Sequence, residues 1–126
     1  MRPLVVTIGG EAGFGIMSAG LTFSKIATRS GYGVYNYAEY PSLIRGGHNV
    51  MQVAFSRAAV RAPYQHTDFL VALNQETIDR HAREIPRGGG VVYDSDKNLN
   101  LPRRFIFAAI FSQKRARKWT SQKDAE

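Results

Sequence analysis

Residues 4–31 read LVVTIGGEAGFGIMSAGLTFSKIATRSG and contain two apolar segments joined by a run of glycines. The first segment, Leu4 to Ile8, is short and rich in β-branched residues, which is typical of a buried strand that enters a tight loop. From Gly15 onward, apolar residues recur at the spacing of one helix face, and Gly31 stands where a helix commonly ends. The expected face consists of Ile16, Ala19, Phe23, Ile26 and Ala27. The run therefore predicts a strand, a glycine loop and a helix in that order.

Beyond residue 31 the sequence continues to alternate extended and helical patterns. We expect strands over 34–40, 49–55 and 69–73, a helix over 76–85 capped by Asn74, and a strand that begins at Val91. The first strand, the first helix and the strand over 34–40 are expected to form a βαβ unit. This alternation predicts an α/β fold, here a layered Rossmann-like domain with a mostly parallel sheet.

The character of the sequence changes after Lys97. All 12 glycines lie at or before position 90, and residues 105–111 form an apolar run that a basic segment follows. A chain of 126 residues corresponds to one domain. We therefore expect an incomplete α/β domain over residues 1–97 and a divergent basic tail over 98–126, with the C-terminal part of the fold missing or replaced. The tail is open to three interpretations: a helix with a solvated basic end, a helix on a membrane surface, or a segment foreign to the fold.

The net charge of +7 is concentrated in the tail. Residues 1–102 hold ten Lys and Arg against eight Asp and Glu, a net of +2, whereas residues 103–126 hold seven against two, a net of +5. A basic face for nucleic acid across the domain is therefore not expected. The chain has no cysteine, which excludes disulfides and cysteine-ligated clusters. No apolar run is long enough for a leader or a membrane span, so the cytoplasm is the expected location.

The glycine loop is the first candidate site. Its candidate anion- or cofactor-binding residues are Gly10, Glu11, Gly13 and Gly15. Glycines let the backbone approach a ligand closely, and the N-terminus of the following helix favours anions. Nucleotide hydrolysis is not expected, because Ile16 and Met17 stand where a phosphate-loop NTPase has Lys and Ser or Thr. A dinucleotide fingerprint fits weakly, with Ser18 in the third glycine position and Glu39 as the ribose-binding acid. The glycines are equally consistent with tight packing of the strand against the helix.

The loop over residues 40–49 is the second candidate site. The candidate substrate- or interface-binding residues are Ser42, Arg45, Gly46, Gly47, His48 and Asn49. Arg45 followed by two glycines places a guanidinium beside backbone N–H groups, an arrangement that suits a carboxylate or a phosphate. Alternatively, Arg45 is structural and bonds carbonyl groups or crosses a subunit boundary. The three histidines lack metal-ligand spacing and the chain has no nucleophile elbow, so neither a metal site nor a catalytic residue is expected.

The segments over residues 10–16, 37–49, 70–77 and 93–96 together resemble the gamma domain of 2-oxoacid:ferredoxin oxidoreductases. The resemblance is to the form that opens the fused alpha subunit of 2-oxoglutarate-type enzymes, and it runs from about Leu4 to Lys97. Its most specific part is YPSLIRGGHN at residues 40–49. One departure is Phe14, which stands where that family favours a polar residue.

The resemblance implies that the chain is a component of a larger enzyme. Complexes of that family decarboxylate a 2-oxoacid oxidatively and transfer the acyl group to coenzyme A. The resemblance implies thiamine diphosphate, iron–sulfur clusters and coenzyme A in the assembled complex, and no cofactor bound by this chain alone. It also implies partner domains or subunits that bind thiamine and clusters, with ferredoxin receiving electrons through the complex. A nucleotide- or dinucleotide-binding module and a truncated fragment without function are the alternatives.

Overall fold

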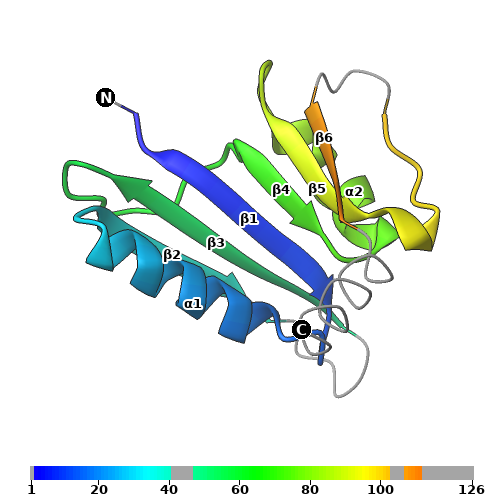
Figure 1. Cartoon of the computed structure of the whole chain (residues 1–126), viewed down its shortest axis with the longest axis horizontal. Coiled ribbons are helices and arrows are strands. Elements are labelled where there is room, and N and C mark those ends of the chain that lie inside the picture. Colours follow the sequence, from blue (N-terminus) through cyan, green and yellow to red (C-terminus); the bar gives the residue numbers. More distant parts are fainter. Residues whose placement is uncertain (1, 41–46, 103–106, 112–126) are drawn as a thin grey trace, which may run out of the picture.

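The computed structural model of the chain describes residues 2–40, 47–102 and 107–111, and these residues form a six-stranded sheet with α-helices against it (Figure 1). The elements in chain order are β1 (Leu4–Glu11), α1 (Ile16–Arg29), β2 (Gly33–Glu39), β3 (His48–Ser56), β4 (Phe69–Ala72), α2 (Gln75–His81), the short 3-10 helix η1 (Ala82–Glu84), β5 (Gly90–Asp94), the 3-10 helix η2 (Ser95–Lys97) and β6 (Phe107–Phe111). In the part of the chain that the structure describes, no helix is long and apolar enough to cross a membrane.

The strand order in the sheet is β2-β3-β1-β4-β5-β6. The neighbours β1, β4, β5 and β6 run parallel to one another. Only β3 runs the other way among these six strands, and it pairs antiparallel with both β1 and β2. The expected α/β class with a mostly parallel sheet is therefore confirmed.

The expected βαβ unit is wrong in one respect, because β1 and β2 do not pair. β3 lies between them, with Val6 opposite Val53 on one side and Asn36 opposite Val53 on the other. The burial of the two strands explains this order. Five consecutive residues of β3, Val50 to Ala54, are buried, whereas β2 carries exposed polar residues and contains no buried one. A strand with apolar residues on both faces gains most in the interior of a sheet, and in β3 the buried polar Gln52 is hydrogen-bonded; the more polar strand is left at the edge.

One face of the sheet packs against α1. The core of this face consists of Val6, Ile8, Ile16, Met51 and Val53. The helix differs from the expected apolar face, because Ile26 is 60% exposed and Ala19 is exposed, while Gly20 and Ser24 are buried. A Cβ at Gly20 would collide with the Met51 side chain. Small residues on α1 thus permit a close approach to β3 that larger apolar side chains would prevent.

The other face of the sheet is covered by α2 and by the segment that joins β3 to β4. Over β4 and β5 the core consists of Leu70, Ala72, Ile78, Ala82, Ile85 and Val91. Over β1 and β3 it consists of Val5, Ala54 and Val60. The expected cap of α2 is confirmed, since the Asn74 side chain accepts a hydrogen bond from the backbone N–H of Thr77 at 3.0 Å. The helix is shorter than expected and ends at His81, where η1 continues the turn.

The sheet continues beyond Lys97. Residues 107–111 pair in parallel with β5, from Gly90 opposite Phe107 to Asp94 opposite Phe111. The two interpretations of the tail as a helix are therefore wrong for residues 107–111. An uncharged run of aromatic and aliphatic residues has high strand propensity, and the open edge of β5 supplies its partner. The proposed division of the chain at residue 97 stays a prediction.

Candidate functional site

The two loops singled out in the sequence meet at one edge of the sheet. β1 ends at Glu11, which lies opposite His48 at the start of β3. The backbone N–H of Ala12 donates a hydrogen bond to the carbonyl of Gly47 at 3.0 Å. β4 and β5 end at the same edge, because they run parallel to β1. Ligands of open α/β sheets bind outside the carboxyl ends of the strands, so both loops lie where such a site is expected.

The glycine loop owes its shape to two residues in the left-handed region of backbone conformation. Gly13 has φ +97° and Gly15 has φ +76°, and a Cβ at either position would meet no described atom within 4 Å. The requirement for glycine there is therefore conformational, and apart from chain neighbours no described residue fills the space beside the backbone. Gly15 caps α1 without any side-chain hydrogen bond. Among the described residues, no side-chain hydrogen bond caps the first N–H groups of this 14-residue helix, as an anion site requires.

Gly10 and Glu11 contribute in different ways. A Cβ at Gly10 would lie 3.0 Å from Leu73 and 3.2 Å from Ile16, so this glycine permits tight packing at the base of the loop. Glu11 is exposed at the end of β1. Gly10 therefore supports the packing interpretation of the loop, whereas Gly13 and Gly15 leave space for a ligand.

Lys97 is a residue of this edge that the sequence analysis did not select. Its ammonium group lies 5.0 Å from the centre of the Phe14 ring and donates to the carbonyl of Leu73 at 3.0 Å. Phe14 itself is 43% exposed. The Phe14 ring thus receives the Lys97 ammonium group and holds that cation beside the glycine loop. The position of Lys97 just after the β5 end was the available signal.

The second loop is described only from Gly47 onward. Ser42, Arg45 and Gly46 lie outside the described residues, so their roles stay predictions. Gly47 is buried, and His48 and Asn49 are half-buried at the start of β3. Asn49 lies opposite Gly10 in the ladder. The structure therefore brings Gly47, His48 and Asn49 next to the glycine loop.

His48 forms a chain of hydrogen bonds with α2 and η1. Its Nε2 lies 2.9 Å from Nε2 of His81, and Nδ1 of His81 lies 3.0 Å from a carboxylate oxygen of Glu84. The ring centres of the two histidines are 5.1 Å apart and the planes differ by 25°. Because the facing nitrogens are much closer than the ring centres, the rings meet edge to edge, as a nearly linear N–H···N bond requires. Sequence spacing does not predict this contact, because the two histidines come from separate elements.

Burial lowers the pKa of His48, and the neighbouring His81 lowers this pKa further. One of the two facing nitrogens must lack a proton in order to accept the hydrogen bond, so a neutral His48 fits the geometry. In the described part of the chain, no group of three or more His, Asp or Glu side chains is placed to hold a metal ion. The arrangement is suited to fixing the start of β3 against α2.

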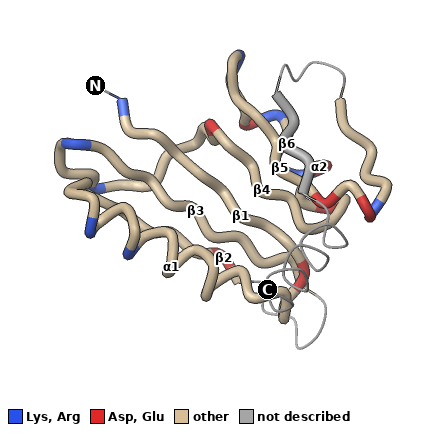
Figure 2. Tube along the Cα trace, viewed as in Figure 1, with Lys and Arg blue, Asp and Glu red and all other residues tan. Residues whose placement is uncertain are grey.

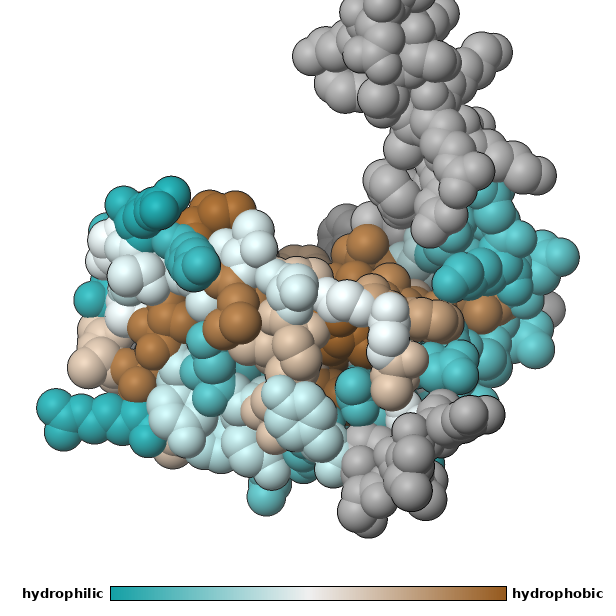
Figure 3. All heavy atoms as spheres, turned by 90° about the horizontal axis from the view of Figure 1, so that it is seen from below, coloured by the Kyte–Doolittle hydropathy of each residue, from teal (hydrophilic) through white to brown (hydrophobic). Residues whose placement is uncertain are grey.

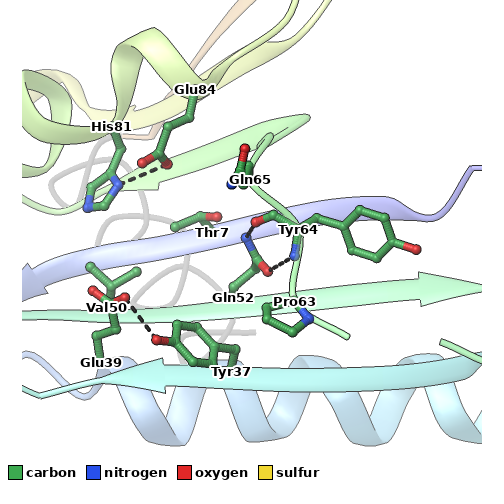
Figure 4. A pocket seen from close by; sticks show the side chains of 10 residues that line it. All are labelled: Thr7, Tyr37, Glu39, Val50, Gln52, Pro63, Tyr64, Gln65, His81 and Glu84. Atoms are coloured by element: carbon green, nitrogen blue, oxygen red, sulfur yellow. Dashed lines mark hydrogen bonds and ion pairs between the residues drawn. The ribbon is translucent and has the colours of Figure 1, made fainter. Parts of the chain in front are cut away.

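A cavity of about 330 Å³ lies beside this chain of hydrogen bonds, between β2 and η1 (Figure 4). Its lining residues are Thr7, Tyr37, Glu39, Val50, Gln52, Pro63, Tyr64, Gln65, His81 and Glu84. Gln52 is fully engaged, since its side-chain amide donates to the Tyr64 carbonyl and accepts from the Tyr64 N–H. Glu39 accepts a hydrogen bond from the Tyr37 hydroxyl at 3.0 Å. Glu39 thus lines a cavity on the α2 side of the sheet, at the end of a strand that is not adjacent to β1, which does not fit a ribose-binding acid.

Comparison with known proteins assigns the fold and the family. The family model described as pyruvate ferredoxin/flavodoxin oxidoreductase matches residues 5–123. The chain is 38% identical over 91 residues to the ketoisovalerate oxidoreductase subunit VorA of Methanothermobacter thermautotrophicus, which covers 71% of this chain and 19% of that protein. It is 36% identical over 78 residues to a 2-oxoacid:ferredoxin oxidoreductase subunit alpha of a Sulfolobus species, which covers 62% of this chain and 12% of that protein.

Two solved structures share the fold. One is the gamma subunit of a keto/oxoacid ferredoxin oxidoreductase from Geobacter sulfurreducens, with 26% identity, a TM-score of 0.76, and coverage of 88% of this chain and 61% of that one. The other is a 2-oxoglutarate:ferredoxin oxidoreductase from Magnetococcus marinus with 2-oxoglutarate, coenzyme A and succinyl-CoA bound. It has 23% identity, a TM-score of 0.78, and coverage of 98% of this chain and 22% of that one.

The chain spans about a fifth or less of the length of the two curated relatives. The family model, by contrast, covers nearly the whole chain, including both loops and the strand β6. With the parallel sheet and the two loops at its carboxyl edge, this match shows that the chain belongs to the pyruvate ferredoxin/flavodoxin oxidoreductase family.

Proposed function

We propose that the chain is the gamma-type domain of a 2-oxoacid:ferredoxin oxidoreductase and that it works only within an assembled complex. The observation that carries the proposal is the family match over residues 5–123, which spans both candidate loops. The complex would decarboxylate a 2-oxoacid oxidatively, form an acyl-CoA and deliver electrons to ferredoxin. The chain's partners would be the thiamine-binding and cluster-binding domains or subunits of that complex, with the cytoplasm as the expected location.

The chain does not fit an iron–sulfur cluster, and its described residues do not fit the divalent cation that accompanies thiamine diphosphate. The sequence has no cysteine to ligate an iron–sulfur cluster. The described residues provide no cluster of His, Asp and Glu for the divalent cation that accompanies a diphosphate. Thiamine diphosphate and the clusters are therefore assigned to partner domains.

The contribution proposed for this chain is an anion-binding edge that faces the partner's active site. Gly13 and Gly15 leave open backbone at the uncapped start of α1. Lys97 adds a positive charge beside them, and the sequence places Arg45 in the adjoining loop. Free N–H groups and cations of this kind suit a carboxylate or a phosphate, the anionic groups of a 2-oxoacid and of coenzyme A. Ser42, Gly46, Gly47, His48 and Asn49 are proposed to shape the same edge or its interface.

The dinucleotide-binding alternative is disfavoured by the topology. A dinucleotide fold needs its second strand beside the first, so that an acid at the end of the second strand reaches the ribose. Here β3 separates β1 from β2. Titration of the purified chain with NAD, flavin mononucleotide and coenzyme A separates the two functions, because tight binding of NAD or flavin would favour the alternative.

The proposed function is tested by assaying the isolated chain with a 2-oxoacid, thiamine diphosphate, coenzyme A and a viologen dye. We expect no dye reduction, because a 2-oxoacid needs the thiazolium ring as an electron sink before electrons can leave. Turnover at a rate comparable with that of an assembled enzyme would contradict the proposal. The third alternative, a fragment without function, predicts that the chain also fails to associate with the thiamine-binding and cluster-binding chains of its host.

A further inference from the structure

β2 is an edge strand without the usual protection against pairing. It is the terminal strand of the sheet, and no described residue pairs with its outer side. Its sequence, GVYNYAE over Gly33–Glu39, has no proline and carries its only charge at the last position. Edge strands normally carry a charge, a proline or a bulge within their length, because a bare edge recruits another strand. β2 therefore presents a row of backbone donors and acceptors that an extended segment can use.

An apolar groove with a cationic wall runs along this open edge. A cavity of about 350 Å³ lies between α1 and β2, lined by Leu21, Ser24, Lys25, Thr28, Arg29, Val34 and Asn36. Leu21 is 49% exposed within it. Figure 3, which views the molecule from the side on which α1 and β2 lie in Figure 1, shows hydrophobic surface bordered by hydrophilic residues.

The charges of this groove are of one sign. α1 contains Lys25 and Arg29 and no acidic residue, and Figure 2 shows its basic residues toward its C-terminal end. Neither Lys25 nor Arg29 forms an ion pair with any described residue, unlike Arg2 and Arg80, which pair with acids. Two unpaired cations beside an open strand suit a partner that carries carboxylates.

The two faces of β2 set the side-chain pattern of an added strand. Val34 and Asn36 face α1, and the Asn36 side-chain oxygen accepts a hydrogen bond from the Ser24 hydroxyl at 2.6 Å. Tyr35 packs on the opposite face against the cluster of Val5, Ala54 and Val60. Tyr37 lies on that same face and is 40% exposed. Alternate residues of an added strand would thus meet the groove or the tyrosines.

We propose that the free edge of β2 is a docking site for an extended, acidic strand of a partner protein. The partner strand pairs its backbone with β2 and inserts apolar side chains beside Leu21 and Val34. Its carboxylates lie against Lys25 and Arg29. Backbone pairing supplies affinity in this mode of recognition, and the side-chain pattern supplies specificity.

A second copy of the chain is a poorer occupant of the same edge. Pairing of β2 with β2 in a symmetric dimer sets the same surface of each copy against itself. Because α1 lies beside β2 in each copy, Lys25 and Arg29 of one copy would then approach the equivalent cations of the other, and like charges close together repel. The charge of the groove therefore selects an acidic partner over self-association.

The test uses the full chain and a fluorescent nine-residue peptide. Every second residue of the peptide is threonine, and the residues between are valine or glutamate. The control peptide carries lysine in place of glutamate. Two further peptides are N-methylated at every second amide. The methyl groups lie on one edge of the strand in the first peptide and on the opposite edge in the second, so each peptide can still pair its backbone along one edge only. Binding is followed by fluorescence anisotropy, and hydrogen exchange of the amides of residues 33–39 is followed by NMR.

We expect the glutamate peptide to bind at least tenfold more tightly than the lysine peptide and to slow exchange of outward-facing β2 amides. One N-methylated peptide should lose binding and the other should retain it. The double substitution Lys25→Glu and Arg29→Glu should reverse the preference between the two charged peptides. Arg83→Glu with Arg87→Glu, which makes the same change in net charge at exposed residues elsewhere, should leave the preference unchanged.

Several outcomes would overturn the docking proposal. The first is absence of binding by the glutamate peptide. The second is loss of binding by both methylated peptides, or by neither, because strand pairing uses only one edge of the peptide. The third is protection of the β2 amides that rises with chain concentration and needs no peptide, which would assign the edge to a second copy. None of these outcomes bears on the activity of the assembled enzyme.

Discussion

A 3.0 Å hydrogen bond from the backbone N–H of Ala12 to the carbonyl of Gly47 holds the two candidate loops side by side at one edge of the sheet. Ala12 follows β1 and Gly47 precedes β3, so the bond extends the antiparallel ladder past Glu11 and His48. Residues that are far apart in the sequence are thereby held side by side at the carboxyl end of the parallel strands. A partner that docks on this edge meets both loops at once.

Burial and the neighbouring His81, which lower the pKa of His48, predict a pH-dependent stability. Because the pKa of His48 is lowered in the folded chain, the unfolded chain binds more protons between that lowered pKa and the ordinary value of 6.5. The free energy of unfolding should therefore rise as pH increases through this interval and level off above it. Urea unfolding midpoints measured from pH 5 to pH 8 give the slope.

Other charged groups near His48 shift its pKa in both directions. Glu76 of α2 and Glu39 of β2 raise its pKa, while Arg80 lowers it. His48→Asn should flatten the pH dependence. An unchanged slope in His48→Asn would show that the histidine pair does not control it.

Gly9 should be the glycine least tolerant of replacement in β1. A Cβ there would lie 2.5 Å from Cγ2 and 2.9 Å from the hydroxyl oxygen of Thr77, which is fully buried. Thr77 cannot turn away without losing the 2.7 Å hydrogen bond from its hydroxyl to Asn74. We expect Gly9→Ala to lower the free energy of unfolding by about 1–3 kcal/mol through overpacking.

Thr77→Ser offers a matched compensation for Gly9→Ala. Serine removes Cγ2 and keeps the hydroxyl that bonds Asn74, so the double variant should recover part of the lost stability in a denaturant titration. Additive losses in the double variant would show that the two side chains do not collide.

Much of the fold follows from the sequence because its patterns are local. The strand over Leu4 to Ile8, the helix after Gly15 and the Asn74 cap each depend on neighbouring residues, and all three are present. The place of β3 between β1 and β2 could not be predicted in this way, because alternation identifies a strand and does not name its partner. Ile26 was expected on the buried face of α1, and it is exposed. The prediction was wrong because close packing of Gly20 on Met51 decides which side of α1 faces the sheet.

The candidate site was likewise predictable from the sequence only in part. The glycine positions with positive φ were visible as glycines in a strand-to-helix loop. The contact between His48 and His81 could not be predicted, because it depends on how α2 lies relative to the start of β3. Lys97 likewise reaches Phe14 across the edge of the sheet, from a turn that sequence alone assigns to a boundary.

The pairing of β6 with β5 predicts different effects for two truncations. Removal of residues 112–126 retains β6, whereas removal of 103–126 exposes the edge of β5. We expect the longer truncation to show a lower Tm and more self-association in analytical ultracentrifugation than the shorter one. A tail foreign to the fold would instead make the two truncated chains equally stable.

Arg45 is predicted from the sequence to act in the assembled complex. A loop arginine that grips an anion or a partner should contribute little to the isolated chain, so Arg45→Ala should change its free energy of unfolding by about 0.5 kcal/mol or less. Loss of a charge-assisted contact should make the free energy of assembly, or of the assembled enzyme's interaction with 2-oxoacid or coenzyme A, less favourable by roughly 1.5–3 kcal/mol. An unfolded Arg45→Ala chain with unchanged assembly would make Arg45 structural.

The most direct test of the proposed function is isolation of the chain from its native host under native conditions, followed by assay of the same fraction for 2-oxoacid-dependent viologen reduction. We expect the chain to elute in a complex with thiamine-binding and cluster-binding polypeptides, and the activity to elute with it. Elution at the size of the free 14.0 kDa chain, separate from all 2-oxoacid oxidoreductase activity, would contradict the account.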